Sequence, residues 1–515
     1  MEKWYLKLLN LIMRFPFLTI IAGIALLYLS MKVAAYVPKT FLPVDDNGEF
    51  AVNYELPTGS SVEATSKIGK EIDKILRSNE KVRTVLVTVG GDNEVNKGEI
   101  YVQLIPFDDR PGYTTTMARD WARDALKDVK GAVIQITTYS STGSSSRPFS
   151  VNLVGYDMEE LKHYSNLLLE RLKQDPRFVE PDTNYRDGKP ELQITLDSRE
   201  AELYGITSTS LGNELRAQVE GLTPAKYRIR GNEYDVRIRL KEEQRDLNKN
   251  FDKIYIPNIN NRLIKLSDVA DGKIASSASV IYRQDKARYI EVSSEIANNV
   301  GLGDLMSDVR KILAEEIKLP PSVRITFTGQ GENFEEMGTS FSTAILFGVL
   351  FVYLILASLY ESFITPFTIL LSLPMAVCGA LFALYITDQS LNLMSMLGIV
   401  MLISLATKSA IVLVDYASER MKEGKDIVTA TKEACQTRFR PIMMSSITTI
   451  VGSLPIALGM SEAAQQRVSM GVVLVGGMIT ATILTLVIIP CVYIYIDKFR
   501  LFCLKLMTWV FRYKE

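Results

Sequence analysis

The sequence has 515 residues, of which 47% are hydrophobic, and a formal net charge of −1. A chain of this length exceeds what one hydrophobic core usually holds, so several domains are expected. The balanced charge gives no indication of a nucleic-acid partner or of a strongly basic surface.

Hydrophobic residues gather towards both ends of the chain, whereas residues from about 37 to 336 are rich in Lys, Glu, Asp and Arg. The four cysteines, Cys378, Cys435, Cys491 and Cys503, all follow this polar part. A disulfide framework is therefore excluded there. His163 is the single histidine and has no cysteine near it, so neither a structural metal site nor a cofactor is expected.

Six stretches have the roughly 20 apolar residues that a helix needs to cross a bilayer. They are residues 15–36, 338–358, 364–387, 391–417, 441–460 and 468–496. The first is either a cleaved signal peptide or an anchor helix. Its apolar stretch, Phe15 to Met31, is long for a signal peptide and is followed by no clear cleavage site, which favours an anchor.

Basic residues in short loops predict the orientation, because Lys and Arg concentrate on the cytoplasmic side. They precede the first stretch, fill the loop between the fourth and fifth, and follow the sixth, whereas loops 387–392 and 461–466 have none. We therefore expect residues 1–36 to hold a cytoplasmic N-terminus and the first span, and residues 498–515 to form a cytoplasmic tail. Residues 426–437 are expected to form an amphipathic helix on the cytoplasmic surface of the 337–497 membrane region.

Lys408 lies deep inside the fourth apolar stretch. An ammonium at that depth costs about 2.5–3.5 kcal/mol even on lenient insertion scales, and such groups usually belong to proton or ion paths. The alternative is snorkelling to the headgroups. Tyr416, near the polar end of the stretch, is eight residues away, or about 12 Å of helix. A lysine stem spans only about half that distance, so a functional role is favoured.

The polar part begins with alternating strands and helices. Strands are predicted at 50–56, 82–89, 98–105 and 132–138, and helices after Ser60 and at 115–129. This is the β-α-β-β-α-β run of a ferredoxin-like (split βαβ) domain, here residues 37–146. Its last residues, 140–146, are a Gly/Ser stretch that is typical of a flexible joint.

A second run of the same kind starts at Phe149 and is interrupted. Its two parts are residues 147–189 and 277–336, with residues 190–276 inserted between them. The insertion contains a predicted hairpin that turns on Gly231-Asn232. No nucleophile–base set and no phosphate-binding glycine loop occurs in the polar part, so an enzyme is not expected.

Several motifs resemble those of one known family. They are Phe41-Leu-Pro43, Phe107 to Gly112, Leu359 to Ser362 with Pro366, Thr407 to Val412, Arg438 to Ile442, and Gly476-Gly-Met478. Together they resemble the resistance-nodulation-division (RND) superfamily of proton-driven exporters, in particular its hydrophobe/amphiphile efflux class. The resemblance covers nearly the whole chain.

The resemblance implies that this chain corresponds to the C-terminal half of such a pump. Family members have two similar halves, with a proton-loading aspartate pair in the first and a lysine in the matching helix of the second. Lys408 stands at the lysine position and would act with carboxylates of the missing half. Thr407 and Ser404 are the hydroxyls that would complete a proton relay, although both are also typical of helix packing. Val472 stands where the family often has a threonine.

The resemblance further implies two porter lobes with a substrate cleft between them, and Tyr139 and Phe149 flank the joint between the lobes. The insertion would be a docking subdomain. Implied partners are an N-terminal RND half or full-length protomers in a trimer, a periplasmic adaptor, an outer-membrane channel and membrane lipid. The implied location is the bacterial inner membrane, with the large domain periplasmic.

One function is favoured over two alternatives. The favoured one is the C-terminal half of a proton-driven pump that exports hydrophobic or amphiphilic small molecules. The alternatives are a non-transporting membrane scaffold or regulatory subunit, and a metal-exporting RND protein. A scaffold would tolerate neutralisation of Lys408. A metal exporter would be expected to carry further membrane carboxylates and a Met or His cluster.

Overall fold

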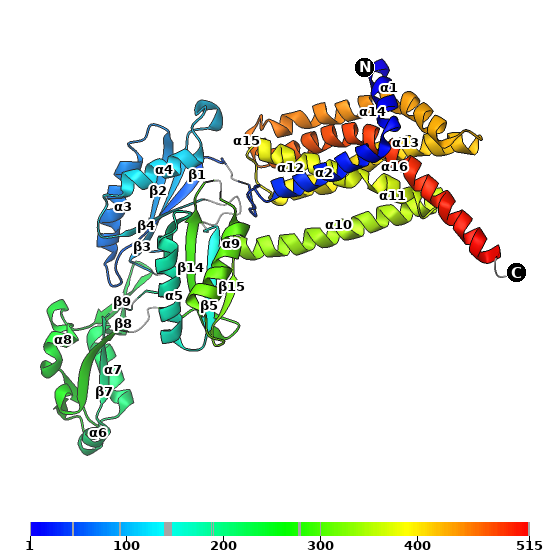
Figure 1. Ribbon diagram of the computed structural model, residues 1–515. Helices are drawn as coiled ribbons and strands as arrows, with labels where there is room; N and C mark the ends of the chain where they lie inside the picture. Colours follow the sequence, from blue (N-terminus) through cyan, green and yellow to red (C-terminus); the bar gives the residue numbers. More distant parts are fainter. Residues whose placement is uncertain are drawn as a thin grey trace. The chain divides into compact units, whose positions relative to one another are not determined.

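The computed structural model describes residues 2–43, 46–91, 94–138, 147–186, 188, 190–276, 280–298 and 300–512 (Figure 1). The chain forms two compact units. The first comprises Met1–Leu56, Val62–Asn184 and Tyr282–Glu515, and the second comprises Pro57–Ser61 and Tyr185–Ile281.

The first lobe of the larger unit is a four-stranded antiparallel sheet with two helices. Its elements are β1 (Glu49–Glu55), α3 (Val62–Leu76), β2 (Val82–Val89), β3 (Lys97–Leu104), α4 (Thr115–Leu126) and β4 (Val133–Thr138). The strand order is β2-β3-β1-β4. Phe50 of β1, Ile72 of α3 and Ala122 of α4 are fully buried in one core, so both helices cover the apolar face of the sheet.

The second lobe repeats this order of elements. They are β5 (Phe149–Gly155), α5 (Met158–Lys173), β6 (Phe178–Thr183), β13 (Arg283–Gln284), β14 (Ala287–Ile296), α9 (Leu302–Lys311) and β15 (Arg324–Phe327). The sheet runs β13-β14-β5-β15, and β6 also pairs with β14. The helix expected to end near residue 317 continues past α9 as a π-helical segment, Ile312–Ile317.

The second unit contains the predicted insertion. Its elements are β7 (Pro190–Leu196), α6 (Ser198–Tyr204), α7 (Ser208–Val219), β8 (Leu222–Ile229), β9 (Asn232–Ile238), α8 (Leu247–Asn250), β10 (Tyr255–Pro257), β11 (Leu263–Lys265) and β12 (Ala270–Ser276). The β8–β9 hairpin is exposed along its whole length. It turns on Arg230-Gly231, both at positive φ, one residue before the predicted turn.

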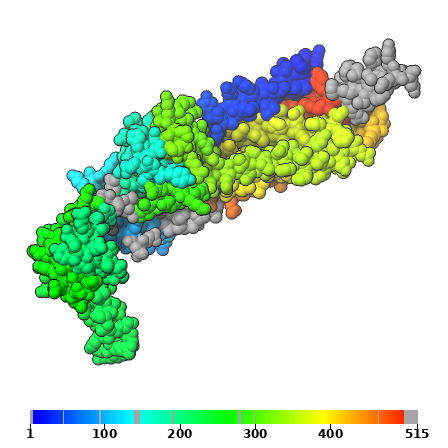
Figure 2. Space-filling view, turned by 90° about the horizontal axis from the view of Figure 1, so that it is seen from below, coloured from blue at the N-terminus to red at the C-terminus, as the bar shows by residue number. Residues whose placement is uncertain are grey.

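The remaining elements are helices. They are α1 (Glu2–Arg14), α2 (Pro16–Ala34), α10 (Gln330–Tyr360), α11 (Thr365–Leu370), α12 (Ser372–Ile386), α13 (Leu393–Lys422), α14 (Ile427–Ala457), α15 (Glu462–Gln465) and α16 (Val468–Arg512). Five stretches of the described chain are long and apolar enough to cross a membrane: Pro16–Ala34, Gln330–Tyr360, Thr365–Ile386, Leu393–Lys422 and Val468–Ile496. Figure 2 shows α10, in yellow-green, as a continuous exposed surface along the helical part.

The predicted span at 441–460 is not among these five, so six spans are not confirmed. Its residues up to Ala457 belong to α14, where serine and threonine side chains lower the hydropathy. These are Ser445, Ser446, Thr448, Thr449 and Ser453. The helix nevertheless packs against α13 and α16.

The helix predicted at 426–437 is present, but it forms the first part of a longer helix, α14, and does not end before Pro441. Asp426 caps α14 by accepting a hydrogen bond from Val428 N–H at 3.2 Å, and the helix then continues without a break to Ala457. Pro441 lies inside the helix rather than at its first turn. Contacts with neighbouring helices stabilise a helix across the one backbone hydrogen bond that proline removes.

Two adjacent glycines bring α16 close to two neighbours. A Cβ added at Gly476 would overlap Ala383 of α12 and approach the Gly379 carbonyl oxygen to 2.9 Å, and a Cβ at Gly477 would overlap Leu402 of α13. Small residues of this kind let helix backbones approach closely in membranes. The glycine pair therefore positions α13 against α16.

Replacing Gly476 by Ala should destabilise the helical bundle by about 1–3 kcal/mol, because the added methyl group is blocked partly by backbone that cannot move aside. Gly348→Ala in α10 is the matched control, since a Cβ there meets nothing within 4 Å. Thermal unfolding of the purified proteins in detergent measures both. Equal melting temperatures for the two variants would contradict this account of the packing.

Candidate functional site

A buried polar cap fixes the beginning of α13. The Asn392 side-chain oxygen accepts hydrogen bonds from Ser395 N–H and from the Ser469 hydroxyl, both at 3.0 Å. Ser395 Oγ in turn accepts from Asn392 N–H at 2.7 Å. Ser469 belongs to α16, so the cap joins the two helices. Together with the glycine pair, it sets the rotation of α13 and hence the direction of each side chain on it.

Lys408 lies in the middle of α13, on a face that the rest of the chain leaves open. It is 15 residues after Leu393 and 14 before Lys422, which places it about 21–23 Å from each helix end. Its side chain is exposed. Among the described residues it has no hydrogen-bond or ion-pair partner.

Between Leu393 and Lys408, the open face of α13 carries the exposed apolar side chains of Leu397 and Met401. Ser404, one turn before the lysine, is the exposed hydroxyl on this face. Asp415 is exposed on the same stripe but seven residues further on, or about 10 Å along the axis, which is too far for an ion pair. The ammonium therefore has no counter-charge within the described part of its own chain.

The two predicted hydroxyls behave differently. Ser404 shares the open face with Lys408, since residues four apart are neighbours on a helix. Thr407 is only 5% exposed, and its hydroxyl donates to the backbone oxygens of Ile403 at 2.9 Å and Ser404 at 3.1 Å. Such bonds within the helix are typical of a packing residue. The structure therefore brings Ser404, and not Thr407, onto the face that carries Lys408.

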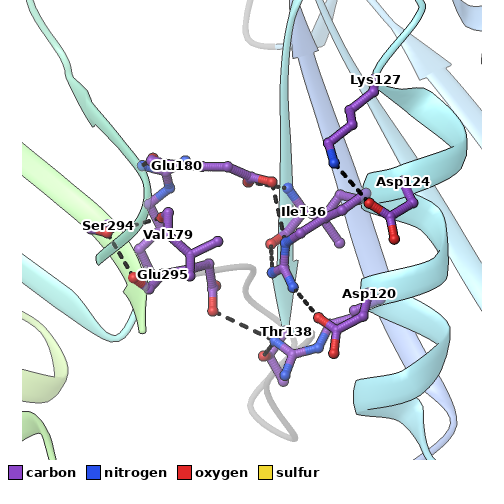
Figure 3. Close-up of polar contacts among 12 residues, drawn as sticks. Asp120, Asp124, Lys127, Ile136, Thr138, Val179, Glu180, Ser294 and Glu295 are labelled. Atoms are coloured by element: carbon purple, nitrogen blue, oxygen red, sulfur yellow. Dashed lines mark hydrogen bonds and ion pairs between the residues drawn. The ribbon is translucent and has the colours of Figure 1, made fainter. Parts of the chain in front are cut away.

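A second polar cluster joins the two lobes of the outer domain (Figure 3). We call it the charged seam. Its members are Arg119, Arg123 and Gln135 of the first lobe and Arg147, Glu180, Asp182 and Glu295 of the second. The Arg123 guanidinium lies 3.2 Å from Glu180, and that of Arg119 lies 3.5 Å from Glu295. The lobes thus meet through ion pairs.

Glu180 is held in an unusual conformation that directs it across the seam. Its φ is +51°, in the left-handed region that non-glycine residues rarely adopt. It sits where the β6–β14 register shifts, and such bulges redirect side chains. One carboxylate oxygen reaches Arg123, and the other accepts from Ile136 N–H at 3.2 Å. Glu180 thereby covers the open edge of β4.

The seam is most buried at Glu295 and its partner. The Glu295 side chain is 4% exposed and that of Arg119 is 12% exposed. Burial raises the pKa of Glu295, an effect that the nearby charge of Arg119 opposes. Burial likewise lowers the pKa of Arg119 and of Arg147. The free-energy cost of removing these charges from water therefore offsets part of the stabilisation that the ion pairs provide.

The predicted cleft residues, Tyr139 and Phe149, flank the Gly/Ser joint between the lobes in the sequence. Tyr139 lies outside the described residues. Phe149 is fully buried, with its ring against Phe178 at 5.1 Å and Phe327 at 6.1 Å. This is the geometry of a core residue of the second lobe, because no surface is left for a ligand.

Sequence reasoning did not find the charged seam. Arg119 and Arg123 lie four residues apart on a polar helix face, which is typical of any solvated helix. Glu295, the partner of Arg119, lies 176 residues further along the chain, and Glu180, the partner of Arg123, lies 57 residues further. Only the docking of the two lobes reveals the pairs.

Replacing Glu180 by Ala should expose the edge of β4 to solvent. Hydrogen exchange of the Ile136 amide should become about tenfold faster, because a charge-assisted hydrogen bond contributes about 1.5 kcal/mol. Lys127→Ala is the control, since its pair with Asp124 lies within α4 and is about three-quarters exposed on both sides. An unchanged exchange rate in the Glu180 variant would show that the seam does not hold the lobes together.

Replacing Glu295 by Gln should flatten the pH dependence of stability. The folded pKa lies above the unfolded value of about 4.3. This group's contribution to stability is therefore fully present below the unfolded pKa and is lost as the pH rises through the folded pKa. The wild-type melting temperature should fall relative to that of the variant over this window. If the difference in melting temperature between the wild type and the Glu295→Gln variant stayed constant with pH, the raised pKa of Glu295 would be contradicted.

The chain is similar to known proteins over nearly its whole length. A family model described as the AcrB/AcrD/AcrF family matches residues 1–497. The multidrug resistance protein MdtC of Proteus mirabilis (strain HI4320) is 28% identical over 492 residues, which are 94% of this chain and 47% of that protein.

Solved structures give a similar result for the fold. Two crystal forms of a heavy metal efflux pump superpose with TM-scores of 0.85 and 0.84 at 22% identity. Each alignment covers 96% of this chain and 52% of the pump. The chain thus spans about half the length of the relatives that it matches. With the family model extending over nearly its whole length, the chain belongs to the AcrB/AcrD/AcrF family of RND efflux transporters.

Proposed function

We propose that this chain acts as the C-terminal half of a proton-driven efflux pump, whose first half is supplied by another polypeptide or by a further part of a longer chain. The observation that carries the proposal is Lys408, an ammonium in mid-helix on an open face with no partner in the described chain. In low dielectric such a charge needs an opposite charge close by. A carboxylate-bearing helix from a partner fits this face.

In this proposal, protonation of the partner's carboxylates drives the transport cycle. An ion pair in low dielectric loses most of its attraction when one member is neutralised. The partner's helix and α13 would then separate or slide past each other, and this conformational change would be transmitted to the outer domain. Ser404 lies beside Lys408 on the same face and is the hydroxyl best placed to exchange a proton there. Thr407 could only accept a hydrogen bond, because its own proton is used within the helix.

The outer domain fits a role in moving substrate between two ferredoxin-like porter lobes. Their contact is a charged seam and not an apolar core, and polar interfaces between domains are typical of domains that move. We infer that the cleft for substrate opens between the lobes. Residues 139 and 149 are not needed for this inference.

The second unit fits a docking subdomain. Along the β8–β9 hairpin, Tyr227, Tyr234 and Ile238 are each more than half exposed. An isolated two-stranded hairpin has little stability in water without a packed face. A neighbouring protomer of a trimer would supply one, with an adaptor and an outer-membrane channel beyond it. The helices would then cross the inner membrane, with both chain ends cytoplasmic and the outer domain periplasmic.

Hydrophobic or amphiphilic small molecules are the proposed substrates. The curated relative is named a multidrug resistance protein. Metal export is the second candidate, because the superposed pump is a heavy metal efflux pump. At 22% identity that likeness concerns the fold. Within the described residues, no three His, Cys, Asp or Glu side chains gather as they would at a metal site.

Lys408→Ala should abolish drug efflux from cells that co-express this chain with an RND first half. Loss of the ammonium leaves the partner's carboxylates unpaired at a cost of about 3–5 kcal/mol, so the efflux rate should fall more than tenfold. Lys408→Arg should also fail, since an arginine is bulkier and stays charged. Accumulation of a fluorescent drug measures the rate.

Lys432→Ala is the matched control, because Lys432 is an exposed lysine outside the predicted span. Protein levels are compared by immunoblot. Full efflux in both Lys408 variants would favour a scaffold and remove the lysine from the mechanism. Full efflux without any first half would rule out a half-transporter.

A further inference from the structure

A small cavity lies at the far end of α13 from the outer domain. Its volume is about 240 Å³, below the 300–1,000 Å³ that is typical of pockets for drug-sized ligands. The polar side chains that line it are Thr365, Thr368, Ser418, Lys422 and Tyr493. They come from α11, α13 and α16, so the cavity is built by three helices.

Several of these groups lack hydrogen-bond partners. Thr368 is fully buried, and its hydroxyl has no partner among the described residues. Buried hydroxyls are nearly always satisfied, so an exception requires an explanation. Ser418 and Lys422 also make no hydrogen bond or ion pair within the described chain. By contrast, the Thr365 hydroxyl donates to Ser362 Oγ at 3.1 Å.

Among the described residues, the lining carries one charge, the ammonium of Lys422, and no carboxylate. Asp415, one turn before Ser418, is not part of this lining. An ammonium and several hydroxyls supply hydrogen-bond donors for a ligand rich in acceptor oxygens. Phosphate oxygens suit such a set, because charge-assisted hydrogen bonds to them are short and strong.

The position of the cavity favours a lipid as the source of the phosphate. Lys422 is the last residue of α13, and the ends of membrane helices lie at the level of the lipid headgroups. Three apolar side chains, Ile364, Met421 and Ile496, complete the lining. They would contact the glycerol and the upper part of the acyl chains.

We propose that this cavity binds the phosphate of a phospholipid headgroup, with Lys422 and the hydroxyls of Thr368 and Ser418 as its ligands. The proposal rests on membership in a membrane-transporter family and not on proton coupling through Lys408. A bound lipid would tie α11, α13 and α16 together at this end of the bundle.

Native mass spectrometry of the full chain, delipidated in detergent, tests the proposal. The added ligands are phosphatidylglycerol, diacylglycerol, which lacks the phosphate, and inorganic phosphate. Phosphatidylglycerol should bind at least tenfold more tightly than diacylglycerol. Lys422→Gln should weaken phosphatidylglycerol binding at least fivefold, and Lys432→Gln, the matched charge control, should change it less than twofold.

Thr368→Val should weaken the same binding about threefold without a change in charge, and Thr368→Ser should restore it. Melting temperatures confirm that each variant is folded. Inorganic phosphate that binds alone with the same dependence on Lys422 and Thr368 would support the site and make free phosphate its source. Equal binding of phosphatidylglycerol and diacylglycerol would overturn the proposal, as would equal losses in the Lys422 and Lys432 variants.

Discussion

The positive charge of Lys408, in the middle of the apolar helix α13, is the main constraint on how the helical part of this chain can be stable in a membrane. Lys408 is too far from either end of α13 for its stem to reach water, and the described chain offers it no carboxylate. Such a group is stable in a membrane only if something else pairs with it. In the proposed function, the counter-charge for Lys408 would bind at this open face of α13.

The rest of the helical region holds that face in place. Gly476 and Gly477 let α16 pack closely against α12 and α13, and the Asn392 cap joins α13 to α16 at its beginning. Glycine contacts and buried hydrogen bonds leave little freedom for a helix to rotate. If α13 moves when a partner is protonated, it should therefore move as a unit with α16.

The two lobes of the outer domain are held together differently from the helices. Its lobes each have a complete apolar core, yet they meet through arginines and carboxylates in the charged seam. Separating the lobes would return these charges to water, which recovers their hydration. An apolar contact of the same size would oppose separation far more strongly. A strained residue, Glu180, holds the seam together, and strain of this kind gathers at sites that function or move.

The amino-acid pattern alone determined most of the architecture: five of the apolar spans, the two β-α-β-β-α-β lobes and the position of Lys408 within its helix. These follow from local periodicity and composition, which act within a few residues. The pattern misjudged residues 426–441, because a proline predicts a helix boundary only while no neighbouring helix compensates for its lost hydrogen bond. It also did not separate Ser404, four residues before Lys408, from Thr407, which directly precedes the lysine. Tertiary structure decided these points, together with the seam and the cavity at Lys422. Each depends on which helix or lobe packs against which, and that is set by contacts between residues far apart in the sequence.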